Sequence, residues 1–103
     1  VLTMPTYAVL FTETPDADPT IRSRVFPDHL AFLSAHSDQV RDAGTLIFGD
    51  GSRYGGMWIV TADTAADVTA LVHADPFWPT GLRAGFEVLE WRKVFGNGAP
   101  LSD

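Results

Sequence analysis

Two residues of this chain carry side chains suited to acid–base chemistry, although they lie far apart in the sequence. His29 stands in the run Pro-Asp-His-Leu-Ala-Phe-Leu, and Asp75 stands in the run Asp-Pro-Phe-Trp. Histidine is the side chain whose ordinary pKa lies closest to neutrality, and a neighbouring carboxylate can fix its tautomer and stabilise its charged form. If the fold brings the two together, we expect His29 to act as a general base and Asp75 to orient its imidazole.

Both residues also have ordinary structural interpretations. A histidine beside an apolar helix stripe can simply bond the backbone. An aspartate before a proline commonly caps a helix N-terminus, with proline at the first helical position. The capping role of Asp75 is compatible with the catalytic one, because one carboxylate oxygen can cap while the other meets His29.

Cationic and aromatic residues near this pair could complete a substrate pocket. Arg22 and Arg24 precede His29 and could steady anionic charge that develops on a substrate. Aromatic side chains could form the walls around a ring, and core packing is the ordinary alternative for each of them. The aromatic candidates are Tyr54, Trp58, Phe77 and Trp78.

Two further histidines, His36 and His73, suggest a metal site as an alternative, because two imidazoles and a carboxylate can hold a metal ion. His29 and His36, however, lie about 10 Å apart along a helix, which is too far for easy shared ligation. The sequence contains no P-loop, dinucleotide-binding, G-x-S-x-G or H-E-x-x-H motif. We therefore expect no metal and no cofactor.

Length and composition limit the kind of protein that can hold this pair. The chain has 103 residues, 46% hydrophobic and 19% charged, so we expect one domain over residues 1–103, with a core over 7–95 and a flexible tail over 96–103. A net charge of −6 without a basic run argues against nucleic acid as a partner. The apolar runs are too short to cross a membrane. The lack of cysteine excludes disulfides and thiolate chemistry, and the cytoplasm is the default location.

The hydrophobic pattern predicts the element order β-α-β-β-α-β. A proline is expected to kink the first helix, and Gly44 is expected to cap its C-terminus. This order is the split βαβ pattern of a ferredoxin-like α+β sandwich, with both helices on one face of a four-stranded sheet. It places His29 on the first helix and Asp75 just after the second. The predicted strands are 7–12, 45–48, 56–61 and 86–95, and the predicted helices are 20–43 and 64–73.

The predicted strands are apolar on both faces. Strand 7–12 places Val9 on one side and Leu10 on the other, and a second strand does the same with Trp58 and Ile59. A half-solvated antiparallel sheet alternates apolar with polar residues, so we expect a second sheet to cover the free face. An identical subunit is the simplest source of that sheet, which predicts a homodimer or a higher assembly built from it.

Several short motifs, in this order and spacing, resemble the YciI-like (YCII-related) family. The motifs are Arg22-x6-His29-Leu30-x2-Leu33, Gly44-x-Leu46-x2-Gly49, Ala74-Asp75-Pro76-Phe77-x3-Gly81 and the closing Lys93-Val94-Phe95. The resemblance implies a dimeric α/β-barrel built from ferredoxin-like subunits. It also implies a His–Asp active site in a cleft beside the sheet, which maps onto His29 and Asp75.

The chain departs from the family pattern at two places. Family members often have an arginine three residues before the histidine and Gly-Pro after the second strand, where this chain has Phe26 and Gly49-Asp50. Arg22 matches another arginine of the pattern. Most members have no established activity, and the best-understood one is a dehydrochlorinase that acts on a chlorinated hydroxyquinol, so the resemblance does not transfer a substrate.

Three functions are compatible with these residues. The first is a small cofactor-free lyase of the dehydrochlorinase type, or an isomerase, in which His29 removes a proton from a small aromatic or lactone substrate. The second is a non-catalytic dimer that binds a small molecule or serves as an accessory protein. The third, less favoured, is a cofactor-free oxygenase of the dimeric barrel type. The enzyme interpretation requires that His29 reach Asp75 and that an accessible pocket adjoin them.

Overall fold

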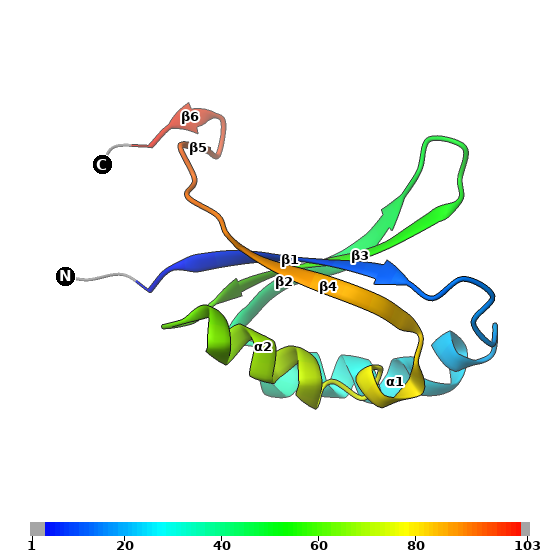
Figure 1. Cartoon of the computed structure of the whole chain (residues 1–103). Coiled ribbons are helices and arrows are strands. Elements are labelled where there is room, and N and C mark those ends of the chain that lie inside the picture. Colours follow the sequence, from blue (N-terminus) through cyan, green and yellow to red (C-terminus); the bar gives the residue numbers. More distant parts are fainter. Residues whose placement is uncertain (1–3, 102–103) are drawn as a thin grey trace.

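The computed structural model describes residues 4–101 and contains a four-stranded antiparallel sheet with two helices on one face (Figure 1). The strands lie in the order β2-β3-β1-β4, so the first strand of the chain is central. This arrangement confirms the predicted α+β, ferredoxin-like architecture. The elements are β1 (Thr6–Glu13), α1 (Ile21–Ala35), β2 (Val40–Ile47), β3 (Arg53–Thr61), α2 (Ala65–Ala74), the 3₁₀ turn η1 (Trp78–Thr80), β4 (Arg83–Glu90), β5 (Phe95–Gly96) and β6 (Ala99–Pro100).

The core lies between the sheet and the helices. Alternate residues of β1 and β3 point toward the helices and are almost fully buried, as the period of two requires. α2 packs its aliphatic stripe onto them, and its start is capped by the Thr64 hydroxyl, which accepts a hydrogen bond from the Asp67 N–H at 3.2 Å. The core residues of these three elements are Tyr7, Val9, Phe11, Trp58, Val60, Val68, Leu71 and Val72.

α1 ends earlier than the sequence predicts. We expected a helix to residue 43 capped by Gly44, but α1 ends at Ala35 and residues 40–47 form β2. The prediction was wrong because Val40, 7% exposed, is buried against β3, where it pairs with Val60. Tertiary burial outweighed the local helical pattern.

Pro27 does not divide α1 into two helices, because a single helix runs through it. Proline has no N–H, so the carbonyl of Ser23, four residues earlier, receives no helical hydrogen bond at this point. The turn that precedes His29 therefore has one backbone bond fewer than a regular helix.

β4 also differs from its predicted range of 86–95. It begins at Arg83 because β1 extends to Glu13 and pairs with it, and the Trp91 N–H makes a last bond, 2.8 Å long, to the Thr6 carbonyl. The strand ends there because β1 offers no further partner. Of the predicted tail, residues 102–103 lie outside the described residues, and a small β5–β6 hairpin occupies residues 95–100. Its turn uses Asn97 and Gly98 at φ 52° and 76°, as a two-residue hairpin turn requires.

Candidate functional site

The fold brings His29 and Asp75 into direct contact. His29 Nδ1 lies 2.9 Å from Asp75 Oδ1. The two residues are 8% and 1% exposed, so the contact is screened from bulk water. The Phe77 ring, 4.7 Å from the imidazole between centroids, packs against the same histidine. The helix α1 and the segment after α2 thus supply one member of the pair each.

The local chain geometry explains how Asp75 is held. It ends α2 with φ −66° and ψ 133°, an extended conformation that suits a residue before proline. Its Oδ1 also accepts a hydrogen bond from the Phe77 N–H at 3.1 Å, while its own carbonyl accepts one from Trp78 at 2.8 Å. The N-cap of η1 is Phe77 and has no side-chain cap, so Asp75 does not cap a helix as expected; instead its Oδ1 holds the turn after α2 and contacts His29 as well.

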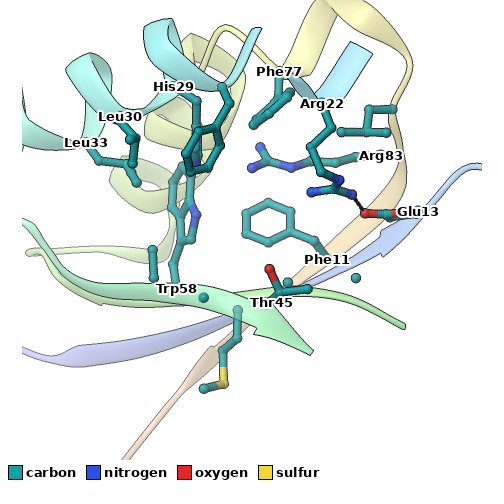
Figure 2. Close-up of a pocket in the computed structure, with 17 residues that line it drawn as sticks. Phe11, Glu13, Arg22, His29, Leu30, Leu33, Thr45, Trp58, Phe77 and Arg83 are labelled. Atoms are coloured by element: carbon teal, nitrogen blue, oxygen red, sulfur yellow. Dashed lines mark ion pairs between the residues drawn. The ribbon is translucent and has the colours of Figure 1, made fainter. Parts of the chain in front are cut away.

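A third residue, Arg83, contacts this pair. Its Nη1 lies 2.9 Å from Asp75 Oδ2, and its side chain is 9% exposed. The contact is an ion pair, since neither atom completes an aligned hydrogen bond among the described residues. The guanidinium lies over the Phe11 ring at 4.0 Å, with Phe77 at 5.6 Å on its other side (Figure 2). Asp75 thus faces a histidine on one oxygen and an arginine on the other.

These partners decide the protonation of Asp75. Burial by itself raises the pKa of this carboxyl, but the hydrogen bond from His29, the charge of Arg83 and the N–H of Phe77 outweigh it, so the pKa lies below its usual value. An ionised carboxylate can only accept a hydrogen bond, so His29 Nδ1 carries the proton between them. In the neutral imidazole Nε2 is then the free acceptor, which is the tautomer a general base needs.

A cavity of about 220 Å³ adjoins the pair. Arg22 enters it from α1 and forms an ion pair with Glu13 at the end of β1 (Figure 2). Burial, together with the charges of Arg53 and Arg83, lowers the pKa of Arg22, which nevertheless stays cationic as arginines do in proteins. The cavity is lined by Phe11, Glu13, Arg22, Phe26, His29, Leu30, Leu33, Ala43, Gly44, Thr45, Gly55, Gly56, Met57, Trp58, Phe77, Leu82 and Arg83.

The family follows from a comparison of the whole chain with known families. Residues 6–92 match the model of the YCII-related domain. The chain belongs to this family. A search of curated proteins found no match to this chain.

Solved structures share the fold of this YCII-related domain. One is 5-chloro-2-hydroxyhydroquinone dehydrochlorinase (TftG) from Burkholderia phenoliruptrix AC1100, in complex with 2,5-dihydroxybenzoquinone. It has a TM-score of 0.69 at 22% identity over 84% of this chain and 93% of that one. Another is a dimeric protein of unknown function and ferredoxin-like fold from Bacteroides fragilis NCTC 9343. It has a TM-score of 0.55 at 14% identity over 87% of this chain and 96% of that one.

The structure brings some of the predicted site residues together and separates others. Arg22, His29 and Phe77 line the cavity, and Asp75 lies directly behind His29. Arg24 does not line the cavity: its Nη1 bonds the Thr20 hydroxyl at 3.2 Å on the helix surface. Two residues apart on a helix, Arg22 and Arg24 cannot share a face.

Two predicted aromatic residues of the YCII-related domain also lie outside the cavity lining. Tyr54 packs against Phe48, with ring centroids 5.6 Å apart. Tyr54 is the extra residue of β3 at the register shift, because Gly55 pairs with Leu46 and Arg53 pairs with Ile47. The alternation of side chains that places Trp58 in the cavity is therefore interrupted before Tyr54. Trp78 lies between the rings of His73 and Phe86, at 4.7 and 5.4 Å, beside α2. Core packing explains Trp78.

Sequence reasoning missed Arg83 because it precedes the predicted strand 86–95, and a second register shift would have hidden its orientation even within a longer strand. On β4, Phe86 faces the helices, and strict alternation would place Ala84 beside it and turn Arg83 away. The β1–β4 ladder shifts between Thr12 and Glu13, so that Ala84 is an extra residue and Arg83 pairs with Glu13. Such a shift changes the face of the sheet toward which a side chain points, and no residue pattern in β4 predicts it.

Two other features of the described residues bear on function. Residues 4–101 contain no group of three or more histidine, cysteine, aspartate or glutamate side chains that could hold a metal ion. Within the same range no helix is long and apolar enough to span a membrane.

Proposed function

We propose that this YCII-related domain is a small cofactor-free enzyme of the lyase type, or an isomerase, in which His29 transfers a proton. The observation that carries the proposal is the buried His29–Asp75 pair at the wall of a cavity. Asp75 holds the imidazole in the tautomer with Nε2 free and would stabilise the imidazolium that forms when it takes a proton. A purely structural histidine would need no cavity beside it.

In an elimination, His29 Nε2 takes a proton from the substrate. The electron pair left behind forms a new double bond, and the bond to the leaving group breaks with its electrons, so that a chlorinated substrate loses H⁺ to His29 and Cl⁻ to the cavity. The imidazolium then gives its proton to water. In an isomerisation, His29 would instead return the proton to another atom of the substrate.

The dimensions of the cavity favour a substrate with a single ring. Its volume of about 220 Å³ lies below the range of about 300–1,000 Å³ typical of sites for drug-sized ligands. Phe77 and Trp58 offer aromatic walls on the same side as His29. A neighbour in fold is named for a substrate of this size, 5-chloro-2-hydroxyhydroquinone, which supports the same class here.

We also propose that the domain works as a homodimer, with the cytoplasm as its location since the chain has no cysteine. The face of the sheet away from the helices presents partly exposed apolar residues that pair across the strands: Ala8, Leu10, Met57, Ile59 and Leu89. A second sheet would bury them, and a fold neighbour is described as dimeric. Light scattering that finds a monomer at micromolar concentration would contradict this assembly.

Turnover tests the enzyme proposal. The wild type should be assayed with 5-chloro-2-hydroxyhydroquinone and then with other hydroxylated or chlorinated aromatics and with lactones, following chloride release and ultraviolet absorbance. His29→Asn should lower turnover by about 10²- to 10⁴-fold with little change in the melting temperature. His36→Asn is the matched control, because His36 lies at the end of the same helix, bonds the Phe32 carbonyl and does not line the cavity. Equal activity in wild type and His29→Asn would remove His29 from the mechanism.

The alternative is a dimer that binds a ring compound without converting it. The same panel distinguishes the two functions, because binding without turnover for every compound, unchanged in His29→Asn, is the result expected of a binding protein. The oxygenase alternative predicts oxygen consumption, which an oxygen electrode would detect in the same assays.

A further inference from the structure

Charged side chains lie in the cavity lining and directly beside it, and the arginines among them outnumber the carboxylates. Glu13 is shared by two guanidinium groups, since it forms an ion pair with Arg22 and lies 3.9 Å from Arg53 Nε. Asp75 is shared by Arg83 and His29. Arg22 and Arg83 in the cavity lining each contact one carboxylate, and Arg53 adds a third cation beside the cavity. The positive charge becomes larger each time His29 takes a proton.

Arg83 is the least satisfied of these cations. A guanidinium has five N–H donors in a fixed fork, and this one touches Asp75 through Nη1 without completing an aligned hydrogen bond. Its side chain is 9% exposed, and Nη1 is its only nitrogen among the buried unpaired atoms of the described residues, so the other donors reach the surface of the cavity. Buried donors in proteins are nearly always paired, and the free side of this group is the cavity that it lines.

The aromatic rings fix the direction of Arg83. The guanidinium lies over Phe11 at 4.0 Å and near Trp58 at 5.4 Å, and Figure 2 shows it next to Arg22 in the space that His29 also borders. The N–H groups of a guanidinium point outward in its own plane, where they match the two oxygens of a carboxylate or the oxygen of an ionised hydroxyl.

We propose that Arg83 and Arg22 form an anion-binding subsite, so that the ligand of this cavity is a single-ring compound bearing a carboxylate or an ionised ring hydroxyl. The subsite deepens the proposed function, on which it rests for the identity of the cavity as the reaction site. Glu13 is shared between Arg22 and Arg53, and Asp75 between Arg83 and His29, so each carboxylate compensates its cations only in part and a bound anion would supply the rest. Negative charge left on the substrate when His29 takes its proton would lie beside the same two arginines.

Binding of matched anionic and neutral rings tests this subsite. Benzoate and 4-nitrophenolate are the anionic probes, and benzamide and nitrobenzene are their neutral counterparts, all titrated by calorimetry at one pH where both anions are ionised. We expect the wild type to prefer each anion by about tenfold to a hundredfold, as a charge-assisted hydrogen bond provides. A preference for benzoate alone assigns the subsite to carboxylates, and a preference for the phenolate alone assigns it to ring oxygens.

Four variants identify the residues responsible for the preference for anionic rings. Arg22→Gln should lower it several-fold, and Arg83→Met should remove most of it. Arg83→Lys keeps the charge opposite Asp75 but loses the fork, so it folds even if Arg83→Met does not, and it should retain a reduced preference. Arg92→Gln removes one cation from the surface pair with Glu90 and should leave the preference unchanged.

The outcomes separate this proposal from the enzyme proposal. If wild type binds anionic and neutral rings equally, or if Arg22→Gln and Arg83→Lys both keep the full preference, the subsite is wrong. His29→Asn should keep the preference for anions while losing turnover. An anion preference in a protein that converts no substrate would leave the subsite standing and contradict the enzyme.

Discussion

Two halves of the space beneath one sheet differ in how they are filled. Under α2 the space is closed by aliphatic side chains, with Val68 and Val72 fully buried and Leu71 7% exposed. α1 is longer, yet its buried residues are Ile21 and His29. The closed half holds the sheet and helix together through burial, whereas the open half leaves a cavity lined by arginines that form ion pairs.

The difference shows how a chain of this size accommodates a charged site. Burying a charge is costly unless it is paired, and every buried ion of the open half has a partner of opposite sign. The closed half needs no polar partners. The two halves should therefore respond in opposite ways to mutation: the open half in activity and pH dependence, the closed half in stability.

The largest effect is expected on turnover in the open half. Replacing a general base typically lowers the rate by about 10²- to 10⁴-fold, so His29→Asn should lower kcat by that factor. Thermal unfolding should change little, because Asn can keep a hydrogen bond to Asp75. A fall in melting temperature that matches the loss of activity would instead assign His29 to the stabilising half.

Asp75→Asn is expected to be an exception, because a change in the open half should here lower stability as well as activity. Asp75 belongs to the site and also forms the ion pair with the buried Arg83. The change leaves the nearly buried Arg83 guanidinium without its anion, and breaking such a buried pair costs about 3–5 kcal/mol of unfolding free energy. Urea denaturation measures this loss, and Asp63→Asn, an exposed residue before α2, is the control. A loss below about 1 kcal/mol would show that the pair contributes little.

The loss of stability at low pH should also depend on Asp75. The pKa of Asp75 lies below its usual value in the folded protein, so its contribution to stability is fully present above the unfolded pKa, about 4, and is lost as the pH falls through the folded pKa. Wild type should lose stability over that acidic range, and Asp75→Asn should lose less over the same range. Parallel acid denaturation curves for the two proteins would contradict the assignment.

A matched pair of truncations compares the halves directly. Val72→Ala removes two fully buried methyl groups and should cost about 2–3 kcal/mol. Leu30→Ala, at a position that is 46% exposed and borders the cavity, should cost less than about 1 kcal/mol although it removes more atoms. Equal losses would show that the cavity half is as tightly packed as the other.

The smallest effect is expected from a substitution that narrows the cavity. A Cβ at Gly56 would lie 3.1 Å from the Gly44 carbonyl oxygen and 3.9 Å from Phe11 Cδ2. Gly56→Ala should therefore narrow the cavity at a stability cost of about 1 kcal/mol and weaken binding of substituted rings more than that of unsubstituted ones. Gly49→Ala, which meets nothing within 4 Å and does not line the cavity, is the control. Uniform weakening for all rings would mean that Gly56 does not limit ligand size.

The meeting of His29 and Asp75 could be predicted because the resemblance to the YCII-related family implies the pair, and the order of elements places both residues on the helix side of one sheet. The sequence was not sufficient where long-range pairing decided the outcome. Arg83 and Tyr54 stand at shifts in strand register, which depend on how two strands meet rather than on either one. The end of α1 was misplaced for a related reason, since the burial of Val40 against β3 is a property of the assembled sheet.

Pro27 should also make local opening of α1 in the open half faster. The carbonyl of Ser23 lacks its helical N–H partner, and the next turn carries His29, so this part of α1 can separate from the sheet by breaking fewer bonds than α2 would. Amide hydrogen exchange should therefore be faster in α1 than in α2, with openings that do not require the whole domain to unfold. Transient fraying of this kind would give a ligand a route past Phe26 to a histidine that is 8% exposed in the closed structure.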